Sequence, residues 1–261
     1  MAETTDHTPA ALLDRAVTAI ETEERRTTAE RDAMQAFRDR VGELSPASQA
    51  LKQGPAAVHS APRTTDGLKS VRAEYESTVM AVPHYEDEYD ESYTEHVHQE
   101  FGPDIATVLV HGGALERRHQ QAILKATAES ITSREQLIEA LQREQESVTE
   151  LREPTCSVAA DIRNIERRAG DDPSAKILDG YRSRLEVLEQ RCHDLVDQRQ
   201  SEMVTERREL LLPISGPDIP SYVYQELPVS YPVVSILTEP MDTARVLQNR
   251  LEARHVDRSK A

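Results

Sequence analysis

Apolar residues recur along most of this chain at helical spacing. Residues three and four apart share one face of an α-helix, whereas a strand needs a period of two. The clearest stretches are residues 134–169 and 174–210, whose apolar positions are spaced alternately by four and three residues. This 3.5-residue repeat is typical of a coiled-coil seam. The pattern predicts an all-α protein, an elongated helical bundle around an antiparallel coiled-coil-like hairpin with arms at about 134–169 and 174–210.

The break between the two arms, Gly170–Pro173, has the composition of a helix-to-helix turn. Glycine commonly ends a helix, and an Asp-Pro pair commonly starts one. If the chain folds back here, residues whose numbers sum to 343 should face one another. The predicted layers run from Ile165 opposite Leu178 to Glu144 opposite Arg199, a pair of opposite charges.

The same register predicts where the pairing stops. The layer after Glu144 and Arg199 would place Leu141 against Glu202, an apolar residue against a charged one. We therefore expect close pairing to end there and other helices to cover Leu141. Pro154 lies inside the first arm, but the apolar phase continues across it, which favours a kink over a helix end.

A long N-terminal helix is predicted to begin at Thr8 and Pro9, a good N-cap followed by proline at the first helical position. The middle of its apolar stripe is polar around residues 23–30, so we expect that part to be solvated. The chain is expected to divide into residues 1–66, with this helix and a Pro-containing linker, and residues 67–261. The second part would be a helical domain with the central hairpin and a Pro-rich connector, 213–232, before the last helix.

Five apolar or aromatic residues at four-residue spacing mark the most distinctive segment, which we expect to form one helix between Pro83 and Gly102. One interpretation is ordinary core packing, since aromatic stripes at helical spacing are usually core. The other is an aromatic-lined groove for a ligand or a partner helix. The five candidate residues are Tyr85, Tyr89, Tyr93, Val97 and Phe101.

The charged residues indicate the environment in which the protein works. The net charge is −16, and the 31 basic residues comprise 26 arginines and only five lysines. Acid excess with little lysine is typical of proteins that work in high salt, where repulsion between carboxylates is screened within about 3 Å at 1 M. We therefore expect a salt-adapted protein and infer no basic partner from its charge.

Nucleic-acid binding would need a basic stripe. The arginine pairs instead each follow a glutamate, which is typical of solvated helix faces with local ion pairs, and the sequence argues against a nucleic-acid partner. No apolar run approaches the roughly 20 residues that span a bilayer, and no targeting segment is visible. We expect a cytoplasmic protein without a membrane partner. The four arginine pairs are Arg25-Arg26, Arg117-Arg118, Arg167-Arg168 and Arg207-Arg208.

Two Glu-x-x-His motifs are the best candidates for chemistry. Glu95 with His98, and Glu116 with His119, each place a carboxylate and an imidazole on one helix face, as in di-iron carboxylate bundles. The chain has 30 glutamates and nine histidines, so about one such match is expected by chance. The chain contains three such matches, the third being Glu252 with His255, which is a small excess over chance. These four residues are kept as an alternative metal set.

Three short segments support a resemblance. They are Val82–Glu86, Glu100–Pro103 and Pro228–Val233, in an acidic, arginine-rich helical chain. In these features the sequence resembles an uncharacterised family of haloarchaeal proteins over roughly residues 68–255. The resemblance implies a helical fold and a salt-adapted source, and it implies no activity and no functional residue.

The sequence carries no catalytic signature and no cofactor motif. Together with the seam-like periodicity, this favours a non-enzymatic helical interaction or structural protein, which binds a protein partner or itself and needs no cofactor. The alternative is a ferritin-like metal-binding protein or oxidoreductase that uses Glu95, His98, Glu116 and His119.

Overall fold

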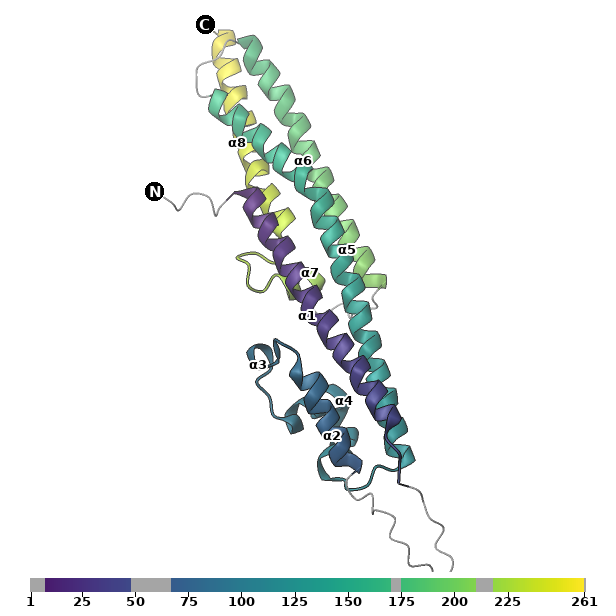
Figure 1. Ribbon diagram of the computed structural model, residues 1–261. Helices are drawn as coiled ribbons and strands as arrows, with labels where there is room; N and C mark the ends of the chain where they lie inside the picture. The colour runs from purple at the N-terminus through teal and green to yellow at the C-terminus, as the bar shows by residue number, and fades with distance from the viewer. Residues whose placement is uncertain (1–7, 48–66, 170–174, 210–217, 261) are drawn as a thin grey trace, which may run out of the picture. The chain divides into compact units, whose positions relative to one another are not determined.

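A computed structural model describes residues 8–47, 67–169, 175–209 and 218–260 (Figure 1). Within these ranges the chain forms helices and no strand, which confirms the all-α prediction. None of these helices is both long enough and apolar enough to cross a membrane. The elements in chain order are α1 (Pro9–Glu43), α2 (Gly67–Thr78), η1 (Val79–Ala81), α3 (Tyr85–Glu88), α4 (Tyr93–His111), α5 (Arg117–Ala169), α6 (Ala175–Glu209), α7 (Ile219–Val223) and α8 (Pro232–Lys260).

The chain divides into two compact units. Unit 1 comprises Met1–Glu23 and Glu139–Ala261, and unit 2 comprises Glu24–Ile138. Helices α1 and α5 each contribute residues to both units, because each runs through a unit boundary. The expected boundary near residue 66 falls at the edge of 48–66, which lies outside the described residues.

Unit 1 is a set of long helices packed side by side. The first part of α1 runs antiparallel to α5, since Asp14 lies against Arg152 and Glu21 against Gln145. Helix α8 packs along α6, where the Gln248 amide donates to the Glu189 carboxylate. The predicted cap of α1 is confirmed, because the Thr8 hydroxyl accepts from the Ala11 N–H at 3.2 Å.

Helices α5 and α6 form the predicted antiparallel hairpin, and one layer of the predicted register is confirmed by a direct contact. The last predicted layer is an ion pair, with Arg199 Nη2 2.6 Å from Glu144 Oε1. Nearer the turn, Arg184 pairs with Asp161. The expected turn, Gly170–Pro173, lies outside the described residues. Buried seam residues include Val148, Leu151, Thr155, Val158, Ile162, Ile165, Leu178, Leu185, Leu188, Cys192 and Leu195.

The predicted end of the pairing is confirmed only in part, because Arg143 of α5 still pairs with Glu209 of α6 beyond it. Leu141 is fully buried, although its register partner would be charged. Glu202 instead accepts a hydrogen bond from the Ser147 hydroxyl at 2.5 Å. Helix α5 continues through Pro154, as the unbroken apolar phase predicted.

Unit 2 packs the later part of α1, α2, η1, α3, α4 and the first part of α5 around its own core. The core is rich in aromatic rings, with Tyr75 of α2 fully buried at its centre. Ring centroids of Phe37 and Phe101 lie 5.0 and 5.7 Å from that of Tyr75. Edge-to-face contacts of this kind add to the free energy of apolar burial.

The prediction of one helix from Pro83 to Gly102 is wrong. The segment forms the single-turn helix α3 and then α4, which starts at Tyr93. Asp90 has φ +44°, a left-handed conformation that ends the first turn. Ser92 and Glu95 then form a capping box that starts α4. The expected break at Gly102 is present as a kink within α4, where Gly102 has φ +77°.

Candidate functional site

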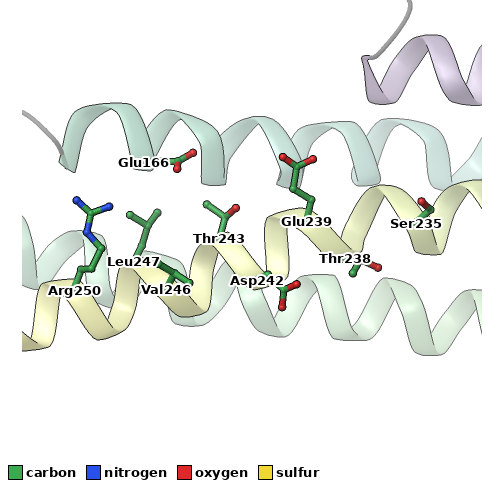
Figure 2. Close-up of a pocket in the computed structure, with 9 residues that line it drawn as sticks. All are labelled: Glu166, Ser235, Thr238, Glu239, Asp242, Thr243, Val246, Leu247 and Arg250. Atoms are coloured by element: carbon green, nitrogen blue, oxygen red, sulfur yellow. The ribbon is translucent and has the colours of Figure 1, made fainter.

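A groove follows the exposed side of α8, between this helix and the last turns of α5 (Figure 2). Its volume is about 690 Å³, within the range of small-ligand and peptide sites. Val246 contributes an exposed apolar surface, 56% accessible, beside the buried Leu247. We call this the α5–α8 groove. Its lining residues are Glu166, Ser235, Thr238, Glu239, Asp242, Thr243, Val246, Leu247 and Arg250.

The α5–α8 groove is lined by charged residues, and an arginine-lined hollow adjoins it at Glu166. The α8 side carries Glu239 and Asp242, and Figure 2 shows the Glu239 side chain projecting toward α5. On the α5 side, Arg163 and Arg167 line an adjoining hollow next to Glu166. The groove itself therefore carries charges of both signs, with Arg250 beside the acidic residues of α8 and Glu166 on α5, while the two arginines of α5 lie next to it.

The Glu166 end of the groove lies beyond the start of α1. Asp14 of α1 contacts Arg152 of α5, and α1 begins at Pro9, only about 7 Å further along its axis. Glu166 lies about 21 Å beyond Arg152 on α5. In the described part of the chain, this section of unit 1 therefore consists of three long helices, α5, α6 and α8, and Figure 1 shows them side by side. No further helix of the described ranges covers the groove at Val246.

A buried polar cluster lies deeper in unit 1, at the last layer of the hairpin. Arg199 Nη2 donates to both oxygens of Glu144 at 2.6 Å, and Arg199 Nη1 donates to Ser147 at 2.7 Å. The hydroxyl of Tyr224, just after α7, donates to Glu144 at 2.6 Å. Burial and the Glu144 charge raise the pKa of Tyr224, which keeps the hydroxyl a donor. The cluster therefore ties α5, α6 and the α7 segment together.

Glu206 extends this cluster toward solvent. It lines a hollow of about 340 Å³ together with Arg199 and Glu202. Burial, followed by the nearby charge of Glu144, raises the pKa of Glu206 to about 7. The charge of this carboxyl group therefore changes near neutral pH.

The candidate aromatic stripe lies in unit 2, and most of it is buried. Tyr89 is partly buried, and its hydroxyl donates to Glu30 at 2.7 Å. The rings of Tyr89 and Tyr85 lie 5.2 and 5.0 Å from the ring of His96, which is itself buried. This geometry agrees with core packing, and the interpretation as a groove stays a prediction. The stripe residues with at most 9% exposure are Tyr85, Tyr93, Val97 and Phe101.

The alternative metal set does not form a ligand group. Glu95 Oε2 accepts from the Ser92 hydroxyl and N–H in the capping box, and these hydrogen bonds lower the pKa of Glu95. His98 lines a hollow of about 300 Å³ beside it. Glu116 pairs with the neighbouring Arg118. Across the described ranges, one group of at least three His, Cys, Asp or Glu ligand atoms lies within 4.8 Å, and it includes neither these two glutamates nor His98 and His119.

That one group consists of Glu30, His84 and Glu88, which the sequence analysis missed. Glu30 lies in the stretch of α1 that was predicted to be solvated, but its side chain is only 15% exposed. The nearby Thr27 is also buried, so the prediction of a solvated middle for α1 is wrong. The sequence does contain a signal for this group, because His84 and Glu88 are four residues apart, about one helical turn. This spacing differs from that of the Glu-x-x-His motifs.

Comparison with known proteins gives a family and no activity. A family model described as Domain of unknown function (DUF7260) matches residues 11–248. No curated protein and no solved structure matches the chain.

Proposed function

Because the chain belongs to the DUF7260 family, a domain of unknown function, we propose its function from its own residues. The protein is a non-enzymatic helical interaction protein, in which the α5–α8 groove binds the same groove of a second copy. The single observation that carries this proposal is the α5–α8 groove, in which no other helix of the described residues covers Val246, 56% exposed. Helical bundles ordinarily cover such a position with a further helix.

Charge favours a second copy as the occupant. In a two-fold dimer the same patch meets itself, so each side must complement the side that it faces. Glu239 on α8 of one copy would face Arg163 and Arg167, which lie beside the groove of the other copy. Such pairs fix register more than they add affinity. Apolar contact around Val246 would supply the attraction that persists in high salt.

The mass of the full chain in solution tests this proposal. We expect sedimentation equilibrium in 2 M KCl to give a dimer that dissociates on dilution. Val246→Glu should weaken the dimer at least tenfold, because it places a carboxylate in the apolar centre of the contact. A monomeric mass for the unchanged chain at every concentration would reject the proposal.

Two further variants make the test specific. Val187 of α6 is similarly exposed, at 58%, and does not line the groove. Val187→Glu should therefore leave the dimer unchanged, and equal weakening by both variants would count against this interface. Glu239→Arg should weaken association, and adding Arg163→Glu to it should restore part of the loss.

We further propose that the protein works in the cytoplasm of a salt-adapted archaeon, and that α5 and α6 pack as a coiled coil. The 26 arginines, five lysines and net charge of −16 support the first part. The burial of seam residues at alternating spacings of four and three supports the second. The dependence of the urea midpoint on KCl tests the salt adaptation.

A further inference from the structure

Three side chains of unit 2 direct one ligand atom each toward a common point. Glu30 comes from α1, while His84 and Glu88 bracket the single turn of α3. His84 Nε2 lies 3.1 Å from Glu30 Oε1 and 4.0 Å from Glu88 Oε2. The His84 and Glu30 side chains are 11% and 15% exposed, and Glu88 is 32% exposed. The group is therefore sheltered on two sides and accessible from the third.

These separations suit a small metal ion. Ligand atoms about 2.0–2.1 Å from a tetrahedral ion lie roughly 3.3 Å from one another. The separation of 3.1 Å between His84 and Glu30 is already close to this value. Glu88, the most exposed of the three, lies 4.0 Å from His84 and within 4.8 Å of Glu30, so its side chain would move inward to bind the ion.

Two arginines hold the carboxylates in this orientation. Arg134 Nε donates to Glu30 Oε2 at 3.0 Å, and Arg26 Nη1 donates to Glu88 Oε1 at 3.0 Å. In each glutamate the arginine contacts one oxygen, and the other oxygen faces His84. The Tyr89 hydroxyl also donates to Glu30 Oε1. Hydrogen bonds of this kind typically orient the ligands of metal sites.

We propose that Glu30, His84 and Glu88 bind one divalent transition-metal ion of the Zn²⁺ and Co²⁺ class. One imidazole nitrogen with two carboxylate oxygens is a donor set for such ions, whereas Mg²⁺ and Ca²⁺ prefer oxygen alone. Three protein ligands leave a fourth position for water or a ligand. The site is independent of the proposed dimer, because its residues all lie in unit 2.

Titration of the metal-free full chain with Co²⁺, followed by visible absorption, tests this site. We expect one ion per chain, with the intense d–d bands of four- or five-coordinate Co²⁺, and displacement by Zn²⁺. His84→Ala and Glu30→Gln should each weaken binding by at least tenfold, because the loss of an orienting neighbour alone costs that much. Zn²⁺ should raise the melting temperature of the unchanged chain and leave that of His84→Ala unchanged.

Matched variants separate this site from adventitious binding. His98→Ala and Glu95→Gln remove a histidine and a glutamate of unit 2 outside the group, and both should bind Co²⁺ normally. Circular dichroism before titration checks that each variant is folded. Without a metal, the His84 imidazole is hydrogen-bonded to Glu30. Absence of Co²⁺ bands at millimolar metal, or unchanged binding by a folded His84→Ala, would overturn the proposal.

Discussion

Glu144 and Arg199 form an ion pair inside an otherwise apolar seam. The Glu144 side chain is fully buried and that of Arg199 is 5% exposed, so both charges are almost removed from water. Such burial costs several kcal/mol per ion, and it is offset only when the remaining hydrogen-bonding positions are filled. Ser147 and Tyr224 fill them here. The pair therefore fixes one register of α5 against α6, because any slip would leave a charge unpaired.

Replacing one residue of the Glu144–Arg199 pair should strongly lower the free energy of unfolding. Arg199→Met leaves Glu144 buried with its charge uncompensated, and we expect a loss of about 3 kcal/mol in the free energy of unfolding. Urea denaturation followed by circular dichroism measures it. Arg143→Met is the matched control, because Arg143 pairs with Glu209 at the exposed surface and should cost less than about 1 kcal/mol. Similar losses in the two variants would mean that the buried pair has no special role.

Glu206 should make stability depend on pH near neutrality. Its folded-state pKa of about 7 lies above the ordinary value of 4.5. Between these values the folded chain keeps a proton that the unfolded chain has lost, so this group's contribution is complete below pH 4.5 and is lost as pH rises through 7. Glu206→Gln should therefore match the unchanged chain near pH 4.5 and exceed its unfolding free energy at pH 8. Glu209→Gln, an exposed neighbour, should leave the profile unchanged; equal profiles for all three chains would refute the assignment.

At the scale of elements, the helical period and the turn residues were sufficient to predict how α5 pairs with α6. The register that joins Glu144 to Arg199 depends on one turn and one period, and both are visible in the sequence. The site at Glu30, His84 and Glu88 could not be predicted in the same way. It joins segments 54 residues apart, and its last residue lies just before the break between α3 and α4. The Ser92-x-x-Glu95 capping box that causes the break was present in the sequence, but the aromatic periodicity across it suggested one helix.

Two glycines should respond oppositely to the same substitution. Gly102 has φ +77° at the kink in α4, so Gly102→Ala strains the backbone, and we expect a loss of about 1 kcal/mol. Gly180 lies in α6, without a positive φ and with open space where a Cβ would be added, so Gly180→Ala should gain about 0.5–1 kcal/mol. Thermal unfolding of both variants measures the two signs. Destabilisation by both, or stabilisation by both, would contradict the conformations described here.

At the scale of the whole molecule, two units share two continuous helices. Unit 1 uses the start of α1 and the end of α5, while unit 2 uses their remaining parts. The candidate interface and the candidate metal site lie in different units, so each can be removed by mutation while the other is measured. Loss of metal binding by Val246→Glu, or of dimerisation by His84→Ala, would show that the two are coupled through the shared helices.

The net charge of −16 predicts how the stability of the chain depends on salt. Repulsion among carboxylates opposes the compact state, and salt screens it over a distance that falls from about 10 Å at 0.1 M to about 3 Å at 1 M. The urea midpoint should therefore rise with KCl, and most of the gain should come below about 0.5 M. A gain confined to molar salt would instead indicate exclusion of salt from the protein surface, and a midpoint independent of KCl would contradict the proposed salt adaptation. Repeating the titration at pH 4.5, where many carboxylates are protonated, should reduce the gain, because less repulsion remains to be screened.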